Sequence, residues 1–140
     1  MKTRGQIEAA ISEAVVRFER EYMGRGPTEA KAYVMDDMIL IRLKGVLTTA
    51  EHQLSMDESD SGRSLIKDVR RELIEKARSL LEMLIVEITG VKVKSMHSDI
   101  STTTGESVIV FTMDHVMPFD GDSRPMQCEH AAEKVLQGRE

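Results

Sequence analysis

Residues 63–89, RSLIKDVRRELIEKARSLLEMLIVEIT, carry the strongest structural signal in the chain. Apolar residues recur there every three or four positions, which is the spacing of one face of an α-helix. At about 1.5 Å per residue, a helix from Arg63 to Thr89 would be about 40 Å long, and Gly90 would end it. The apolar band consists of Leu65, Ile66, Val69, Leu73, Ile74, Ala77, Leu80, Leu81, Leu84, Ile85 and Ile88. This band is longer and wider than one small sheet needs, so the sequence predicts surplus apolar surface.

Two β-hairpins flank this predicted helix. The first joins Ala30–Met35 to Met38–Leu47 through Asp36-Asp37, and the second joins residues 91–101 to residues 106–114 through Thr103-Thr104-Gly105. Residues 107–113 are apolar on both faces, so we expect a central strand that is covered on both sides.

Two shorter helices are indicated by capping boxes, in which a threonine is followed three residues later by Gln or Glu. Thr3 with Gln6 begins the first, and Thr48 with Glu51 begins the second, which ends near Ser55. The first carries an apolar stripe of Ile7, Ala10, Ile11, Ala14, Val15, Phe18 and Tyr22. Residues 24–27, GRGP, end it, because two glycines and a proline do not continue a helix easily. Residues 56–62 are polar and acidic and are typical of a solvated linker.

The order α-ββ-α-α-ββ predicts an α+β fold. We expect an antiparallel sheet of about four strands, made of two hairpins, with the long helix packed on one face. Residues 1–114 are predicted to form a single domain. Residues 115–140 are predicted to be a C-terminal tail, in which residues 126–136 have the pattern of a short helix.

The second face of this sheet is predicted to be apolar as well. Met38, Leu40, Met96 and Ile100 are expected on the face away from Ile39 and Ile41, and such a face is not left in water. Either the first helix or a second copy of the chain would cover it. The surplus apolar width of the long helix favours a homodimer.

Composition excludes several classes of protein. A formal net charge of -5 argues against a nucleic-acid partner, which selects a basic excess. Cys128 is the only cysteine, which excludes an internal disulfide and a cysteine-based zinc site. No apolar run approaches the roughly 18 residues that cross a bilayer, and the first residues lack a signal-peptide pattern. We therefore expect a cytoplasmic protein without direct membrane insertion, and we predict no cofactor and no metal.

Two groups of residues could carry chemistry. His97 and Asp99 lie two apart on a predicted strand, so both side chains face the same way and could form a proton relay or ligand site. The alternative is a polar strand end that bonds its neighbours. Arg25 stands between two glycines and could hold a carboxylate or phosphate, although a helix terminator with a solvent-facing arginine has the same sequence.

Several stretches together resemble a known family. They are residues 21–27 (EYMGRGP), 43–48 (LKGVLT), 88–93 (ITGVKV) and 97–102 (HSDIST), with Gly105-Glu106. In this combination the chain, from about Lys2 to Asp114, resembles a bacterial family long catalogued as a domain of unknown function and later named MpsC. The resemblance implies association with a sodium-translocating, membrane-potential-generating system whose other parts resemble inorganic-carbon transporters. By match to the family motif, the ligand-binding candidates are Arg25, Gly26, Thr48, His97 and Asp99.

Three functional hypotheses follow. The first is a non-enzymatic accessory or regulatory protein that acts by protein–protein contact, as a homodimer and with a membrane transporter subunit as a further partner. The second is a sensor of a small molecule or anion that uses Arg25, His97 and Asp99 around one cleft. The third is an enzyme with His97 as its base; no catalytic constellation in the sequence favours it.

Overall fold

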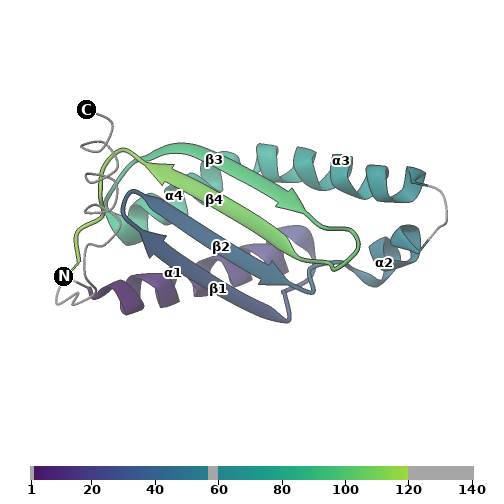
Figure 1. The fold of residues 1–140 in the computed structure, drawn as a ribbon, viewed down its shortest axis with the longest axis horizontal. Coiled ribbons are helices and arrows are strands. Elements are labelled where there is room, and N and C mark those ends of the chain that lie inside the picture. The colour runs from purple at the N-terminus through teal and green to yellow at the C-terminus, as the bar shows by residue number, and fades with distance from the viewer. Residues whose placement is uncertain (1, 57–59, 120–140) are drawn as a thin grey trace, which may run out of the picture.

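A four-stranded antiparallel sheet forms one layer of the structure and the main helices form the other (Figure 1). The computed structural model describes residues 2–56 and 60–119. The strands are β1 (Glu29–Met35), β2 (Met38–Lys44), β3 (Val93–Ile100) and β4 (Ser107–Met113). Their order in the sheet is β1-β2-β4-β3, so the two predicted hairpins meet through their second strands. The predicted α+β class and the four-stranded antiparallel sheet are confirmed.

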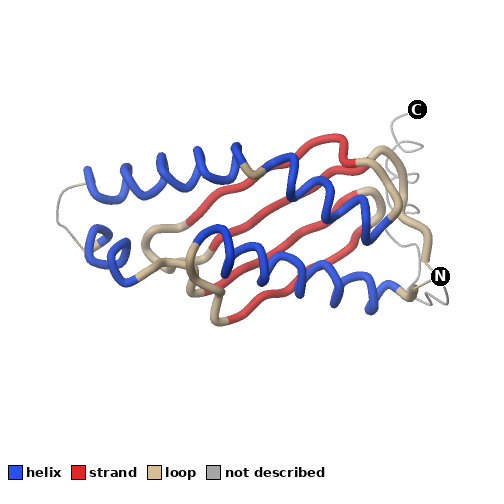
Figure 2. Tube along the Cα trace, turned by 180° about the vertical axis from the view of Figure 1, so that it is seen from behind, coloured by secondary structure: helices blue, strands red, loops and turns tan. Residues whose placement is uncertain are grey.

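Two helices run along the same face of the sheet: α1 (Arg4–Phe18), which packs on β1, and α4 (Arg78–Thr89), which contacts α1 and β3 (Figure 2). The first helix therefore does not cover the second face of the sheet. The helices α2 (Thr49–Ser55) and α3 (Ser61–Lys76) pack against each other and extend past the strand ends. The helix α3 also contacts β3. Residues 126–136, predicted as a short helix, lie outside the described residues.

The predicted single helix from Arg63 to Thr89 is wrong at one position, because it is divided into α3 and α4 at Ala77. Ala77 has φ -89° and ψ 0°, which interrupts the helical repeat while its amide still donates to the carbonyl of Leu73. One straight helix of about 40 Å would overrun strands of seven or eight residues. The break lets α4 follow the sheet while α3 continues beyond it.

The apolar core lies between the sheet and the helix layer. Alternate strand residues such as Ile41, Ile109 and Phe111 are fully buried there, and they meet the stripe of α1 formed by Ile7, Ile11, Val15 and Phe18. Met117 is also 2% exposed and belongs to the same core. Tyr22 does not complete the stripe: it is 40% exposed and stacks on Phe18, with ring centroids 5.1 Å apart. A π-helical turn, η1 (Glu19–Met23), follows α1 and displaces Tyr22 from the line of the stripe.

Two of the predicted face assignments are wrong. Met96 pairs with Phe111, which in turn pairs with Ile39, so Met96 lies on the helix-covered face. Ile100 is likewise buried on that face, whereas Met38 and Leu40 are half-buried on the other. An irregularity between Val93 and Ser95 shifts the register of β3. The strand β4 is central, as predicted, but within residues 2–56 and 60–119 helices cover only one of its faces.

Gly62 and Gly5 provide a matched test of the packing between α2 and α3. Each glycine is the second residue of its helix, where alanine normally stabilises by about 0.5–1 kcal/mol. An added Cβ at Gly62 would collide with the backbone carbonyl of Leu54, whereas nothing lies within 4 Å of one at Gly5. We therefore expect Gly62→Ala to lower the free energy of unfolding and Gly5→Ala to raise it, as measured by urea denaturation. Two changes of the same sign would contradict this packing.

Candidate functional site

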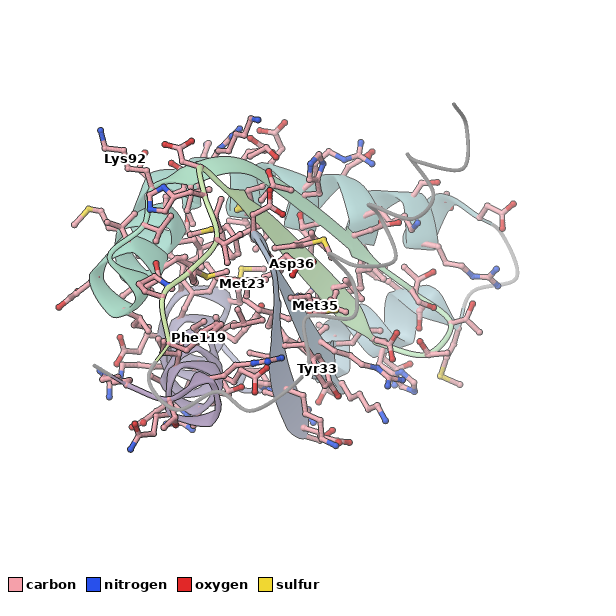
Figure 3. All side chains as sticks on the ribbon, turned by 60° about the vertical axis from the view of Figure 1, so that its left-hand side comes forward. Met23, Tyr33, Met35, Asp36, Lys92 and Phe119 are labelled. Atoms are coloured by element: carbon pink, nitrogen blue, oxygen red, sulfur yellow. The ribbon has the colours of Figure 1, made fainter. Side chains whose placement is uncertain are left out.

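The sheet face opposite the helices carries an apolar patch that no described element covers. The register places Tyr33, Leu40, Val110 and His97 in one row across the four strands. Tyr33 is 39% exposed and Met35 38%, and both lie on the side of the strands away from α1 and α4 (Figure 3). We call this patch the open face; its apolar members are Tyr33, Met35, Met38, Leu40, Val108 and Val110.

Polar and charged side chains surround the apolar part of the open face. On β3, Ser95 Oγ lies 3.3 Å from His97 Nε2 and also hydrogen-bonds Thr112 on β4. On β2, Arg42 Nε donates to Glu106 Oε2 at 2.8 Å. This apolar centre with a polar rim is the usual composition of a protein–protein interface.

A buried acid lies on the opposite side of the sheet, at the end of α1. Glu19 follows Val15 by four residues, so the helical repeat directs it toward the core, and it is 1% exposed. It begins the π-helical turn η1, a local distortion that is common at functional sites. Its Oε2 atom has no hydrogen-bond partner among the described residues.

Arg70 links this region to the helix α2. Its guanidinium donates to both carboxylate oxygens of Glu51, each at 2.7 Å, and to the backbone carbonyl of Val46 at 2.9 Å. Thr48 positions Glu51 through the predicted capping box: the Thr48 amide donates to Glu51 Oε1, and the Glu51 amide donates to Thr48 Oγ1. A buried arginine that binds both oxygens of a carboxylate in this way fixes the distance between the two helices that carry them, here α3 and α2.

The two carboxyl groups of this cluster differ in protonation. Burial raises the pKa of Glu19 to about 7, because the opposing charge of Arg70 offsets only part of it and Glu51 adds to the rise. Burial would also raise the pKa of Glu51, but hydrogen bonds from Arg70 and Thr48 outweigh it, so that the pKa of Glu51 lies below its ordinary value. Glu51 is therefore the ionised partner of Arg70, and Glu19 is the acid that titrates near neutral pH.

A cavity of about 30 Å³ adjoins Glu19 and Arg70. Its other polar side chains come from α3 and from the β3–β4 end of the sheet: Lys67, Arg71, Ser98, Asp99 and Ser107. A groove of about 410 Å³ shares Lys67, Asp99 and Ile100 with this cavity and continues along the β3–β4 turn. Lys67 Nζ lies 3.6 Å from Asp99 Oδ1 across the shared part.

The candidates predicted from the sequence lie in different places. Arg25 lines a groove of about 200 Å³ with His52, Thr103 and Thr104, and Gly26 lies against the side chain of Arg20. Thr48 caps α2, and His97 lies on the open face. Asp99 pairs with Val108 and so shares the open face with His97; its side chain is 77% exposed, and the residue also borders the cavity beside Glu19. Arg25 and Asp99 line separate hollows, and ligand binding by any of the five stays a prediction.

Two further properties bear on function. In residues 2–56 and 60–119, no three His, Cys, Asp or Glu side chains are placed to share a metal ion. Within the same ranges, no helix combines the length and apolar character needed to cross a membrane.

Sequence reasoning missed Glu19 and Arg70, the two buried charged residues of the cluster. The signal was present: Arg70 lies four residues after Ile66 and four before Ile74, on the buried side of α3. A charged residue at a core position of a helix needs a partner from elsewhere. Glu51 could have been proposed as that partner, since its capping box already fixes its side chain at the start of α2.

Comparison with known proteins places the chain in a family. The family model described as "Na+-translocating membrane potential-generating system (MpsC)" matches residues 3–115. A relative named "Uncharacterized protein YbcI", from Bacillus subtilis (strain 168), is 43% identical over 112 residues, which cover 80% of this chain and 89% of that protein. No solved structure gives a significant match. The chain belongs to the MpsC family.

Proposed function

We propose that this chain is a cytoplasmic accessory protein that acts by protein–protein contact, as a homodimer, in the membrane-potential-generating system for which its family is described. The observation that carries the proposal is the open face, where six apolar residues on three adjacent strands lack cover from any described element. An apolar patch of this kind with a polar rim marks an interaction surface.

A second copy is the proposed occupant of the open face. Tyr33, Leu40 and Val110 lie in one row across the strands, and a two-fold axis along this row would set the same patch of each copy against the other. The apolar centres would then pack together as in a β-sandwich. The charges at the far end of the open face do not compete with this arrangement, because Lys31 and Lys44 pair with Glu29, and Arg42 pairs with Glu106, within one chain.

A pair of substitutions tests this surface. Leu40→Arg places a charge at the centre of the open face, and Met83→Arg places the same charge on the outer face of α4, where Met83 is 68% exposed. We expect Leu40→Arg to convert the dimer to monomer and Met83→Arg to leave it intact, as measured by size-exclusion chromatography with light scattering. If Met83→Arg alone dissociated the dimer, the interface would lie on the helix layer and the proposal would be contradicted.

The same pair tests the proposed role in cells. In cells that lack the gene, a potential-sensitive dye would report whether each variant restores the membrane potential. The proposal predicts restoration by the wild-type chain and by Met83→Arg, but not by a Leu40→Arg protein expressed at the same level. Equal restoration of the membrane potential by both variants would show that the function does not require the open face.

A further inference from the structure

The buried carboxyl group of Glu19 is an unsatisfied group at the junction of several elements. Its Oε2 atom has lost contact with water and has no hydrogen-bond partner among the described residues. A buried carboxylate without a partner is strongly unfavourable, so such a group holds a proton or draws water to itself. The adjoining cavity of about 30 Å³ is large enough for a water molecule.

The charges around Glu19 do not neutralise it. From α3, Arg70, Lys67 and Arg71 line the cavity, but Arg70 is held by Glu51 and Lys67 pairs with Asp99. From α2, the carboxylate of Glu51 repels a negative charge on Glu19, whereas from β3 the Asp99 carboxylate is 77% exposed and is paired with Lys67. An ionised Glu19 would therefore compete with Glu51 for Arg70.

The element held by this cluster is the α2–α3 corner, which we define as Thr49–Ser55 with Ser61–Lys76. The helix α2 has no buried residue, and α2 packs mainly on α3. Polar links from the corner to the sheet layer include the Arg70–Val46 hydrogen bond and the Lys67–Asp99 ion pair. Because α2 has no buried residue, it opens at a lower free energy than the core, whereas α3 is anchored by the buried side chains of Ile66 and Ile74.

We propose that Glu19 is a proton-operated latch for the α2–α3 corner: while Glu19 is protonated, Arg70 stays bound to Glu51 and α2 stays docked on α3, and loss of the proton draws Arg70 toward Glu19 and releases α2. Arg70 belongs to α3, so its movement toward an ionised Glu19 breaks the Arg70–Glu51 contact that joins α3 to α2. The proposal goes beyond the open face, which lies on the other side of the sheet, because it adds control by pH.

Hydrogen–deuterium exchange of the intact chain tests the latch. After correction for the intrinsic exchange rate, we expect opening of α2 to increase about tenfold from pH 6 to pH 8 in the wild-type chain, given a pKa of about 7 docked and an ordinary value of 4.5 released. Glu19→Gln should abolish this increase. Glu21→Gln, an exposed neighbour in the same turn, should retain it. Equal pH dependence in Glu19→Gln and the wild type would overturn the proposal.

A second measurement does not depend on the folding of a variant. In the wild-type chain labelled with ¹³C at glutamate carboxyls, the signal of Glu19 should titrate with a midpoint near 7. The amide signals of α2 should shift with the same midpoint. A Glu19 titration midpoint near the ordinary pKa of 4.5 would contradict the proposed latch. Amide signals of α2 that do not shift with the Glu19 midpoint would contradict it as well.

Discussion

Arg70→Ala is expected to lower the free energy of unfolding by about 3–5 kcal/mol, which is the usual penalty for breaking one side of a buried ion pair. Arg70 is 6% exposed, and its guanidinium donates two hydrogen bonds to Glu51 and one to the carbonyl of Val46. Its removal leaves the partly buried Glu51 carboxylate without its charged partner and removes a donor from the Val46 carbonyl, close to a second acid at Glu19; the Thr48 amide still donates to Glu51. A loss of this size is a large part of the roughly 5–15 kcal/mol that stabilises a typical domain.

Arg71→Ala is the matched control for this experiment. Arg71 is the next residue of α3, its side chain is 69% exposed, and its ion pair with Asp68 is long at 4.0 Å. Such a surface pair contributes about 0–1 kcal/mol, so the control should unfold close to the wild type. Urea denaturation at pH 7, followed by circular dichroism, measures both. Equal stability of Arg70→Ala and Arg71→Ala would mean that the Arg70–Glu51 pair does not hold the helices together.

Stability is expected to fall as the pH rises through neutrality, and Glu19 is the cause. Its pKa is about 7 in the folded chain and returns to the ordinary value of 4.5 on unfolding, so between these values the folded chain holds a proton that the unfolded chain has lost. The favourable contribution of this proton is complete below pH 4.5 and is lost progressively as the pH rises through 7. From pH 5.5 to pH 8, the group should lower the free energy of unfolding by about 2 kcal/mol.

Glu19→Gln should flatten this dependence, because glutamine has nearly the same shape and does not ionise. At pH 8 the variant should therefore be more stable than the wild type, which is unusual for a substitution in a buried position. Urea denaturation across this pH range, with Glu21→Gln as the exposed control, measures the difference. A wild-type chain that gains stability toward pH 8, in parallel with Glu19→Gln, would show that Glu19 is already ionised in the fold.

The local elements of this fold could be predicted from the sequence. Thr3 with Gln6 and Thr48 with Glu51 form the expected capping boxes, since these contacts lie within one turn of helix. The β1–β2 turn is also where Asp36 and Asp37 predicted it; Asp36 has φ 53°, a conformation that aspartate tolerates.

The features that depend on distant contacts could not be predicted. No proline or glycine marks the break at Ala77, which follows from the length of the sheet beneath α4. The face of Met96 is set by the register of β3 on β4, and a one-residue shift reverses it. The five candidate site residues came from motif match, whereas Glu19 and Arg70 became visible only when α1, α2 and α3 were placed together.

Sedimentation equilibrium of the full chain is the most direct test of the claim that the open face joins two copies. At micromolar concentration and near-neutral pH, we predict a mass about twice that of the 15.7 kDa chain. A single species of 15.7 kDa over the whole concentration range would contradict the claim, because the apolar row through Tyr33 and Leu40 would then remain without a second copy.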